Sequence, residues 1–271
     1  MRAAGESVCA HKPVLTGLDE LPAAGARRGS QHPSDLQLGA RAMDGPVPGL
    51  AQQDWPADDE LLALAAGMKP REVAPLHFGA PASPKLAAAL AGEHIDADAL
   101  VANARFALRG SRPGTGTIAV VEGVGGLLVP FSDSFTVRDF AAALALPVLI
   151  AARPGLGTIN HTLLTLAAAR AARLEVCAVV LTPWPRAPEE VERSNREEIE
   201  RLGEVEVAVL RRVRGPDLGE LERAGRWLPW RRWLGETPAD ARGGASRSAR
   251  AAREGRVDGR RSDGAPAAAR P

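Results

Sequence analysis

An acidic residue among glycines is the sharpest chemical signal in this sequence. In VEGVGG, Val121 to Gly126, Glu122 directly follows an apolar run, and three glycines stand close to it. Glycines let backbone N–H groups approach a ligand closely. A carboxylate there can bind Mg²⁺, which takes oxygen ligands and shares them with phosphate groups. The alternative is a tight turn in which Glu122 is only solvated, and the spacing favours the binding role.

A lysine stands at the end of another apolar stretch, near the start of the chain. In SVCAHKPVLTG, Ser7 to Gly17, Lys12 comes where a predicted strand opens into a loop. A lysine in that position commonly contacts something bound beside the strand end. We therefore predict a ligand next to Lys12.

A second glycine-rich junction precedes a predicted helix, in ARPGLGTINHTLLT, Ala152 to Thr165. Free N–H groups and the dipole at a helix start attract a carboxylate or a phosphate. Asn160 lies in the first turn and can donate to such a group, and Thr158 is well placed as the N-cap. The alternative, that Gly155 and Gly157 only make the turn, stays open.

Two neighbouring acids, Asp58 and Asp59, stand at the start of the amphipathic stretch DWPADDELLALAAG. Acids at the start of a helix are good N-caps and interact favourably with the helix dipole. From the residues alone, capping is the preferred interpretation of both.

Strands and helices alternate through the middle of the chain. Apolar runs predict strands at 117–121, 148–154, 175–185 and 205–216, with the third broken by Pro183 and Pro185. Helical patterns occur at 138–147, 158–174 and 188–203. The alternation predicts an α/β fold, with a parallel sheet and helices on both faces. Ligands bind beyond the carboxyl ends of such strands, so the loops after residues 14, 121, 152, 181 and 213 should share one rim.

Composition favours a soluble cytoplasmic protein. The net charge is +1 and the hydrophobic fraction is 45%, so nothing indicates a nucleic-acid partner or an anionic membrane surface. The two cysteines, Cys9 and Cys177, form neither a disulfide framework nor a metal cluster, which fits a reducing compartment. The longest nearly apolar run, Phe140 to Ala152, is too short to span a bilayer.

Two segments differ in composition from the rest of the chain. Residues 21–53 are rich in Gly, Ala, Pro, Arg and Gln and are predicted to be an insertion or mobile loop. Residues 237–271 contain almost no large apolar side chain and are predicted to be a disordered basic tail. The α/β domain then comprises residues 1–20, its truncated start, and 54–236.

Four motifs, taken in order, resemble the dethiobiotin synthetase family. They are HKPVLTG, VEGVGGLLVPFSDSFTVRDFA, LPVLIAARPGLGTINHTLLT, and VVLTPWP followed by SNREEI. The resemblance covers Val8 to Leu221 apart from residues 21–53. It implies a P-loop NTPase-like sheet and an ATP- and Mg²⁺-dependent ligase of biotin biosynthesis. Such an enzyme carboxylates 7,8-diaminopelargonic acid with CO₂ and closes the ring of dethiobiotin.

The resemblance also implies roles for individual residues. Lys12 becomes the catalytic lysine beside the carbamate and the γ-phosphate, and Thr16 contacts the diamine. Asp58 and Glu122 become the Mg²⁺ ligands, with Asp59 one position away from the family pattern, so the resemblance reverses the capping interpretation. The other implied contacts are with the nucleotide, at Asp58, Glu122, Gly123, Val124, Gly125, Thr182, Pro183 and Arg214, and with the substrate carboxylate, at Gly155, Leu156 and Asn160. Because that substrate loop comes from the neighbouring subunit in this family, a homodimer is implied.

The chain departs from the family pattern in several features. The P-loop motif GxxxxGK[ST], whose backbone cradles phosphates, does not occur in the chain. Family members often have Asn where Thr182 and Pro183 stand, and proline where Arg214 stands. Only a few residues precede Ser7, whereas a strand–loop–helix unit needs about thirty. We therefore expect the chain to begin inside the fold, without the first strand and the P-loop, leaving unpaired strand edges and weak ATP binding.

Two other interpretations remain from the sequence. The chain can be a non-catalytic remnant of the family that still dimerises, or a relative of the cobyrinate and cobyric acid synthases. Those synthases are longer and carry a glutamine amidotransferase domain, which 271 residues without a catalytic cysteine context do not supply.

Overall fold

The computed structural model of this protein describes residues 1–20, 55–109 and 117–235. The predicted insertion at 21–53 and the predicted tail at 237–271 lie outside these residues. Met1–Leu228 form one compact unit. The second unit starts at Pro229, and its described part contains one short helix, α9 (Trp230–Trp233).

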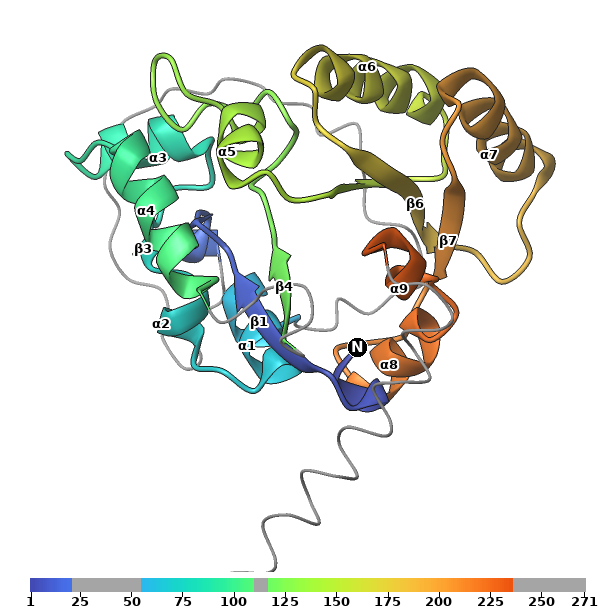
Figure 1. Ribbon diagram of the computed structural model, residues 1–271, viewed down its shortest axis with the longest axis horizontal. Helices are drawn as coiled ribbons and strands as arrows, with labels where there is room; N and C mark the ends of the chain where they lie inside the picture. The colour runs from blue at the N-terminus through green and yellow to red at the C-terminus, as the bar shows by residue number, and fades with distance from the viewer. Residues whose placement is uncertain (21–54, 110–116, 236–271) are drawn as a thin grey trace, which may run out of the picture. The chain divides into compact units, whose positions relative to one another are not determined.

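The first unit alternates strands and helices along the chain (Figure 1). Its strands are β1 (Ser7–His11), β2 (Val14–Leu15), β3 (Leu76–His77), β4 (Thr117–Val121), β5 (Val148–Ala152), β6 (Val176–Trp184) and β7 (Val207–Arg211). Its α-helices are α1 (Asp58–Ala66), α2 (Pro70–Val73), α3 (Pro84–Leu90), α4 (Ala97–Ala107), α5 (Val137–Leu144), α6 (Thr158–Ala171), α7 (Glu190–Gly203) and α8 (Leu218–Gly225). Two 3₁₀ turns, η1 (Arg2–Ala4) and η2 (Leu18–Glu20), complete it.

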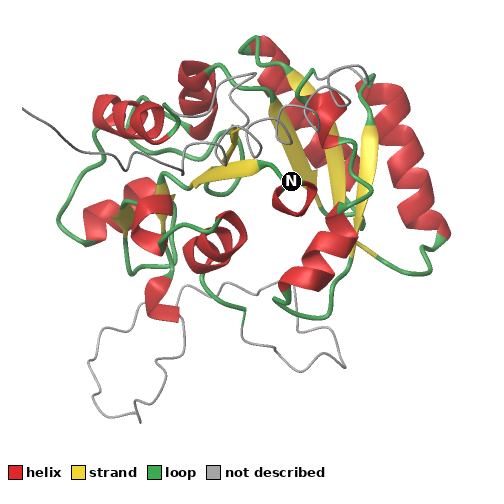
Figure 2. Ribbon diagram, turned by 60° about the horizontal axis from the view of Figure 1, so that its bottom comes forward, coloured by secondary structure: helices red, strands yellow, loops and turns green. Residues whose placement is uncertain are grey.

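All pairings between these strands are parallel, as the sequence predicts. β1 pairs with β4, β2 with β3, and β6 lies between β5 and β7. The three strands of the last group are seen side by side in Figure 2. The α/β fold with a parallel sheet is therefore confirmed.

The strands form separate pieces rather than one continuous sheet. Among the described residues, β4 pairs only with β1 and β5 pairs only with β6, so each of them has one edge without a strand partner. On β5, which is apolar throughout, Leu149 remains 45% exposed.

Helices cover both faces of the β1–β4 piece. Successive side chains of a strand point to opposite faces, so Cys9 and Ala10 of β1 show what covers each face. On one face Ala10 packs in a buried cluster with Ala63 and Ala66 of α1 and with Val73 of α2. On the other face the thiol of Cys9 donates to the carbonyl oxygen of Ala107, at the end of α4, over 3.4 Å. The prediction of helices on both faces is correct for this piece.

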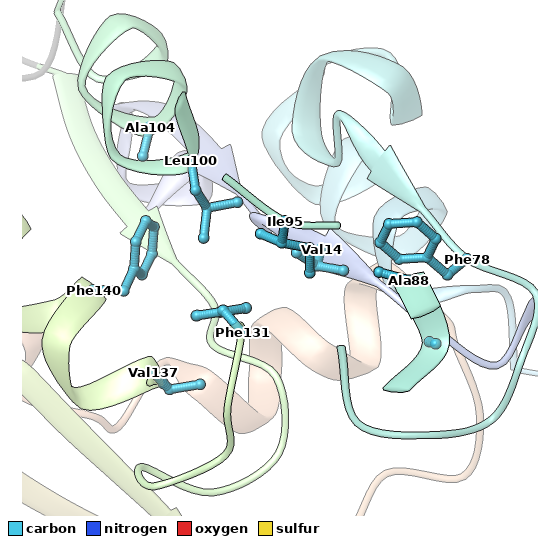
Figure 3. Close-up of a cluster of buried hydrophobic side chains, with 10 residues drawn as sticks. Val14, Phe78, Ala88, Ile95, Leu100, Ala104, Phe131, Val137 and Phe140 are labelled. Atoms are coloured by element: carbon cyan, nitrogen blue, oxygen red, sulfur yellow. The ribbon is translucent and has the colours of Figure 1, made fainter. Parts of the chain in front are cut away.

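The largest apolar cluster joins β2, α3, α4 and α5 (Figure 3). Phe131 lies within it and meets the ring of Phe140 edge-on, with the ring centroids 5.8 Å apart. Burying such a ring removes enough apolar surface to stabilise the fold by about 1.5–3 kcal/mol. This cluster holds the loop after β4 against α5.

A second cluster lies between the β5–β6–β7 sheet and helices α6 and α7. Val179 and Leu181 of β6 are fully buried there, against Leu166 of α6 and Ile199 of α7. Figure 1 shows the two helices side by side next to these strands, as expected when crossovers of the same hand connect neighbouring parallel strands in order.

Several boundaries differ from the sequence prediction. β6 continues through Pro183 to Trp184, where the prediction had it broken; a proline is tolerated because the ladder with β7 skips from Leu181 to Trp184. The predicted N-cap Thr158 is the first helical residue, and Gly157 is the N-cap of α6. Asp58 and Asp59 do not cap α1 either. The N-cap of α1 is Ala57, and there is no side-chain capping hydrogen bond at this helix start.

Candidate active site

Lys12 and Glu122 come together through the register of two parallel strands. His11 of β1 lies opposite Val121 of β4, so the next residue of each strand, Lys12 and Glu122, emerges at the same carboxyl end. The N–H of Glu122 donates to the carbonyl oxygen of His11 over 2.9 Å. The Nζ atom of Lys12 then reaches Oε1 of Glu122 at 2.7 Å.

Asp58 is brought to the same lysine by helix α1. Lys12 points to the same face of β1 as Ala10, two residues earlier, and that is the face on which α1 packs. Asp58, in the first turn of α1, places Oδ2 at 2.9 Å from the lysine Nζ. The two carboxylates, from separate parts of the sequence, thus converge on one cation.

Lys12 is the buried member of this cluster. The side chain of Lys12 is 5% exposed, whereas those of Asp58 and Glu122 are 59% and 44% exposed. Burial by itself lowers the pKa of Lys12, but hydrogen bonding and attraction to Glu122, and then to Asp58, outweigh it and raise the pKa above its usual value. Lys12 therefore stays charged at neutral pH.

Asp59, the alternative to Asp58, has a different partner. Its side chain is buried, and its Oδ2 lies 3.2 Å from Nε2 of His77. Adjacent positions on a helix point about 100° apart, so only one of the two acids can face Lys12. The structure thus places Asp58 with Lys12 and Glu122, whereas Asp59 is buried and contacts His77.

The loop after β4 has the tight turn that its glycines suggest. Gly125 has a φ of +66°, and a Cβ atom there would come within 3.0 Å of a methyl group of Val129. A larger residue would be strained in that conformation and would push Val129 away. Gly123 and Val124 lead into this turn directly from Glu122, so the backbone of the predicted nucleotide-binding loop stays close to the carboxylate.

The β5–α6 loop is fixed by a residue that the sequence reasoning missed. Asn195 of α7 is buried, and its Nδ2 atom donates to the carbonyl oxygens of Pro154 and Gly155 over 2.9 and 3.1 Å. Asn195 stands in the SNREEI motif, and a polar residue on the apolar side of an otherwise charged helix is the signal that points to it. Leu156, at the tip of the loop, is 98% exposed, and Asn160 is also exposed.

The other predicted residues lie at further strand ends. Thr16 directly follows β2 and is half-buried, while Thr182 and Pro183 belong to the end of β6. Arg214 lies beyond β7, and its N–H donates to Oε2 of Glu220 over 3.0 Å. Within the described ranges, no hydrogen bond or ion pair joins Lys12 to these residues or to the β5–α6 loop.

The sequence of this chain is similar to proteins of known families. A family model described as an AAA domain matches residues 50–212. An ATP-dependent dethiobiotin synthetase of Anaeromyxobacter sp. (strain Fw109-5) is 41% identical over 175 residues, which is 60% of this chain and 74% of that protein. The chain belongs to the dethiobiotin synthetase family. This confirms the family suggested by the four sequence motifs.

Two further dethiobiotin synthetases show similar identity. The protein of Anaeromyxobacter dehalogenans (strain 2CP-1 / ATCC BAA-258) is 44% identical over 143 residues, and that of Mycobacterium avium (strain 104) is 41% identical over 150 residues. These matches cover 52% and 55% of this chain. The chain spans 59% and 65% of those two dethiobiotin synthetases, which is less than two thirds of their length.

Across residues 1–20, 55–109 and 117–235, no helix combines the length and the hydropathy that crossing a bilayer requires.

Proposed function

We propose that this chain performs the reaction for which its family is named, the ATP-dependent formation of dethiobiotin from 7,8-diaminopelargonic acid and CO₂. The single observation that supports the proposal best is the convergence of Asp58 and Glu122 on Lys12. In this reaction an amine of the substrate adds to CO₂, and the resulting carbamate takes the γ-phosphoryl group of ATP. The second amine then closes the ring and releases phosphate.

The two carboxylates fit a Mg²⁺ ion. Their oxygens already meet at one cationic atom, and Mg²⁺ is characteristically held by one or two carboxylates together with phosphate oxygens. Asp58 and Glu122 would hold the ion, which when bound neutralises charge on the phosphates of ATP.

Besides Mg²⁺, the proposed site has a positive charge from the protein, the ammonium group of Lys12. Negative charge develops on the transferring phosphoryl group, and a fixed ammonium in a site of low exposure stabilises it more than solvent does. The side chain of Lys12 has few alternative positions because it is 5% exposed. We assign Lys12 the role of catalytic residue, contacting the carbamate and the γ-phosphate.

The β5–α6 loop would bind the carboxylate end of the diamine. Gly155 to Asn160 combine backbone N–H groups at the start of α6 with the amide of Asn160, a common site for a carboxylate. The exposure of Leu156 and Asn160 supports a loop that reaches a neighbouring subunit, and a homodimer is part of the proposal. Thr16 would contact the same substrate.

The nucleotide would lie along the loops after β4, β6 and β7. Gly123, Val124 and Gly125 follow Glu122, while Thr182, Pro183 and Arg214 stand where the family contacts the base. No GxxxxGK[ST] sequence occurs in the 271 residues. We therefore expect slow turnover when this polypeptide is assayed alone. The alternative is a non-catalytic member that still dimerises, an idea favoured by the open edges of β4 and β5.

The test is production of dethiobiotin by the purified chain. The chain is incubated with 7,8-diaminopelargonic acid, labelled bicarbonate, ATP and Mg²⁺, and both labelled dethiobiotin and phosphate are measured. We expect phosphate release to require the diamine and to equal dethiobiotin formed. Formation of neither product by a folded dimer would support the non-catalytic alternative and reject the proposed activity.

Two adjacent acids provide a matched control. Asp58→Asn removes a carboxylate that contacts Lys12, whereas Asp59→Asn alters one that contacts His77. Asp58→Asn should reduce turnover by at least the roughly 10- to 100-fold that loss of a supporting group costs a metal site. Asp59→Asn should act mainly on thermal stability. Equal loss of turnover in both variants would contradict the assignment of Asp58.

A further inference from the structure

Helix α1 is held at both ends by residues that flank strand β1. At its first turn, Asp58 contacts Lys12, the residue after β1. At its last turn, the Nη1 atom of Arg2, which precedes β1, donates to the carbonyl oxygens of Leu64 and Ala65, each over 3.4 Å. The helix therefore runs opposite to the strand on which it packs, and the two are seen side by side in Figure 1.

The buried contact between α1 and β1 is made by small side chains. Ala10 of β1 lies against Ala63 and Ala66 of α1, and three larger apolar side chains that pack against this cluster are only partly buried. Side chains that interdigitate resist rotation and sliding of a helix, whereas alanine methyl groups interlock little. Rotation or sliding of α1 would carry Asp58 away from Lys12. The position of Asp58 therefore depends strongly on the contacts at the two helix ends.

Gly67 lets the guanidinium group of Arg2 approach the end of α1 closely. It is the C-cap of the helix, with a φ of +72°, and its N–H donates to the carbonyl oxygen of Ala63 over 2.7 Å. A Cβ atom at this position would come within 2.8–2.9 Å of three atoms of the guanidinium group. Another residue there would strain the backbone and would also displace Arg2. The helix end and the arginine thus fit each other.

Arg2 also supplies a positive charge that α1 lacks. The first turn of the helix carries three acids, and its last turn contains no basic residue. Carbonyl oxygens at a helix C-terminus carry partial negative charge, so a cation beside them stabilises the helix. The 3₁₀ turn η1 fixes the backbone of Arg2, whose carbonyl oxygen accepts a hydrogen bond from the N–H of Gly5 over 2.9 Å. The charge therefore stands at the end of α1 that has no cation of its own.

We propose that Arg2 is a positioning residue of the candidate active site and acts through α1 on Asp58. Its guanidinium group holds the last turn of the helix, so that the first turn keeps Asp58 in contact with Lys12. The nine residues of α1 put about 13 Å between the two helix ends, so Arg2 acts without contacting a ligand at the site. The inference rests on the proposed function only for the identity of the ion, Mg²⁺, that Asp58 would hold.

The first test is the chemical reactivity of Lys12 in the full chain. The chain has three lysines, Lys12, Lys69 and Lys85, so acetylation of each can be followed by mass spectrometry. Lys12 is 5% exposed and paired with Asp58, whereas Lys85 is 47% exposed and serves as the internal reference. Arg2→Ala should raise the rate for Lys12 relative to Lys85 by roughly two- to fivefold, the factor that a cation at a helix C-terminus contributes.

Three further variants separate positioning from a general loss of stability. Arg71→Ala removes an exposed arginine of the next helix, α2, and should leave the ratio of the two rates unchanged. Arg2→Lys keeps the cation and should give a ratio between those of the wild type and Arg2→Ala. Asp58→Asn gives the ratio reached when the contact with Lys12 is weakened directly. An Arg2→Ala ratio equal to that of the wild type, or matched by Arg71→Ala, would overturn the proposal.

The second test is the affinity for Mg²⁺, measured without ATP or turnover from the rise of the Tm with Mg²⁺ concentration. Arg2→Ala should raise the Kd for Mg²⁺ by the same factor as the Lys12 rate, and Arg71→Ala should not. An unchanged Kd in Arg2→Ala would overturn the proposed effect on Asp58. Absence of Mg²⁺ binding to the wild type would count against the proposed function, and the acetylation ratio would then decide the role of Arg2 by itself.

Discussion

The Nζ atom of Lys12 lies 2.7 Å from Oε1 of Glu122, although 110 residues separate the two in the chain. Each is the first residue after its own strand, and the pairing of His11 with Val121 brings the two strand ends level. Asp58 completes the contact from the first turn of α1. The candidate site is therefore built by one strand register and by one helix packed on it.

Replacing Lys12 should make the fold more responsive to Mg²⁺. In Lys12→Met two carboxylates face each other without a cation, so Mg²⁺ should stabilise the variant more than it stabilises the wild type. At ten times Kd a bound ligand adds about 1.4 kcal/mol, which in a domain of this size raises the Tm by roughly 2–4 °C per kcal/mol. Scanning calorimetry with and without Mg²⁺ measures the difference. The double variant Lys12→Met/Glu122→Gln is the control, and an equal Mg²⁺ response in it would contradict the shared cation position.

Asn195→Ala should loosen the β5–α6 loop. The carbonyl oxygens of Pro154 and Gly155 lose a buried donor, which costs about 1–3 kcal/mol of unfolding free energy. Amide hydrogen exchange should rise at Leu156 and Gly157. Ser194→Ala, at an exposed neighbouring position of the same helix, is the control. Unchanged exchange in Asn195→Ala would show that the loop holds its position without the amide.

Stability should fall on mild acidification because of His11. Its ring is buried, neither ring nitrogen has a hydrogen-bond partner among the described residues, and burial lowers its pKa below the ordinary 6.5. The unfolded chain then binds more protons than the native one between these two pKa values. Stability is thus complete above pH 6.5 and is lost as the pH falls toward the folded pKa, by at most about 1.4 kcal/mol per pH unit.

Denaturant unfolding at several pH values measures this effect. His11→Phe should flatten the pH dependence of the unfolding free energy below pH 6.5. His94→Phe, at an exposed position, should leave that dependence as it is in the wild type. A parallel pH profile for His11→Phe and the wild type would show that other groups cause the acid sensitivity.

Leu156→Asp should weaken self-association. A leucine that is 98% exposed at the tip of a loop is explained if a second copy covers it, and a carboxylate there would have to be desolvated in the contact. Sedimentation velocity should show a shift from dimer to monomer. Leu90→Asp, which changes a leucine on α3 that is 67% exposed, serves as the comparison. Loss of the dimer in both variants, or in neither, would argue against the loop as the contact.

The parallel α/β fold could be predicted because its strands are continuous apolar runs and its helices have their own periodicity. β4 occupies the predicted residues 117–121, and β5 and α6 begin where expected. These features depend on neighbouring residues and on burial of both strand faces. β6 could not be delimited in the same way, because the ladder that lets it pass Pro183 is a contact with β7.

The residue types at strand ends pointed by themselves to a site that binds phosphate and metal, with Lys12 and Glu122 as members. Only the tertiary structure chose between Asp58 and Asp59, because the packing of α1 on β1 sets which side of the helix faces the lysine. It also added Asn195, whose contacts with Pro154 and Gly155 join parts of the chain that are far apart in the sequence. The physical reason is that the sequence gives the type of each side chain, whereas the distances between side chains that contact one cation are set by strand register and helix packing.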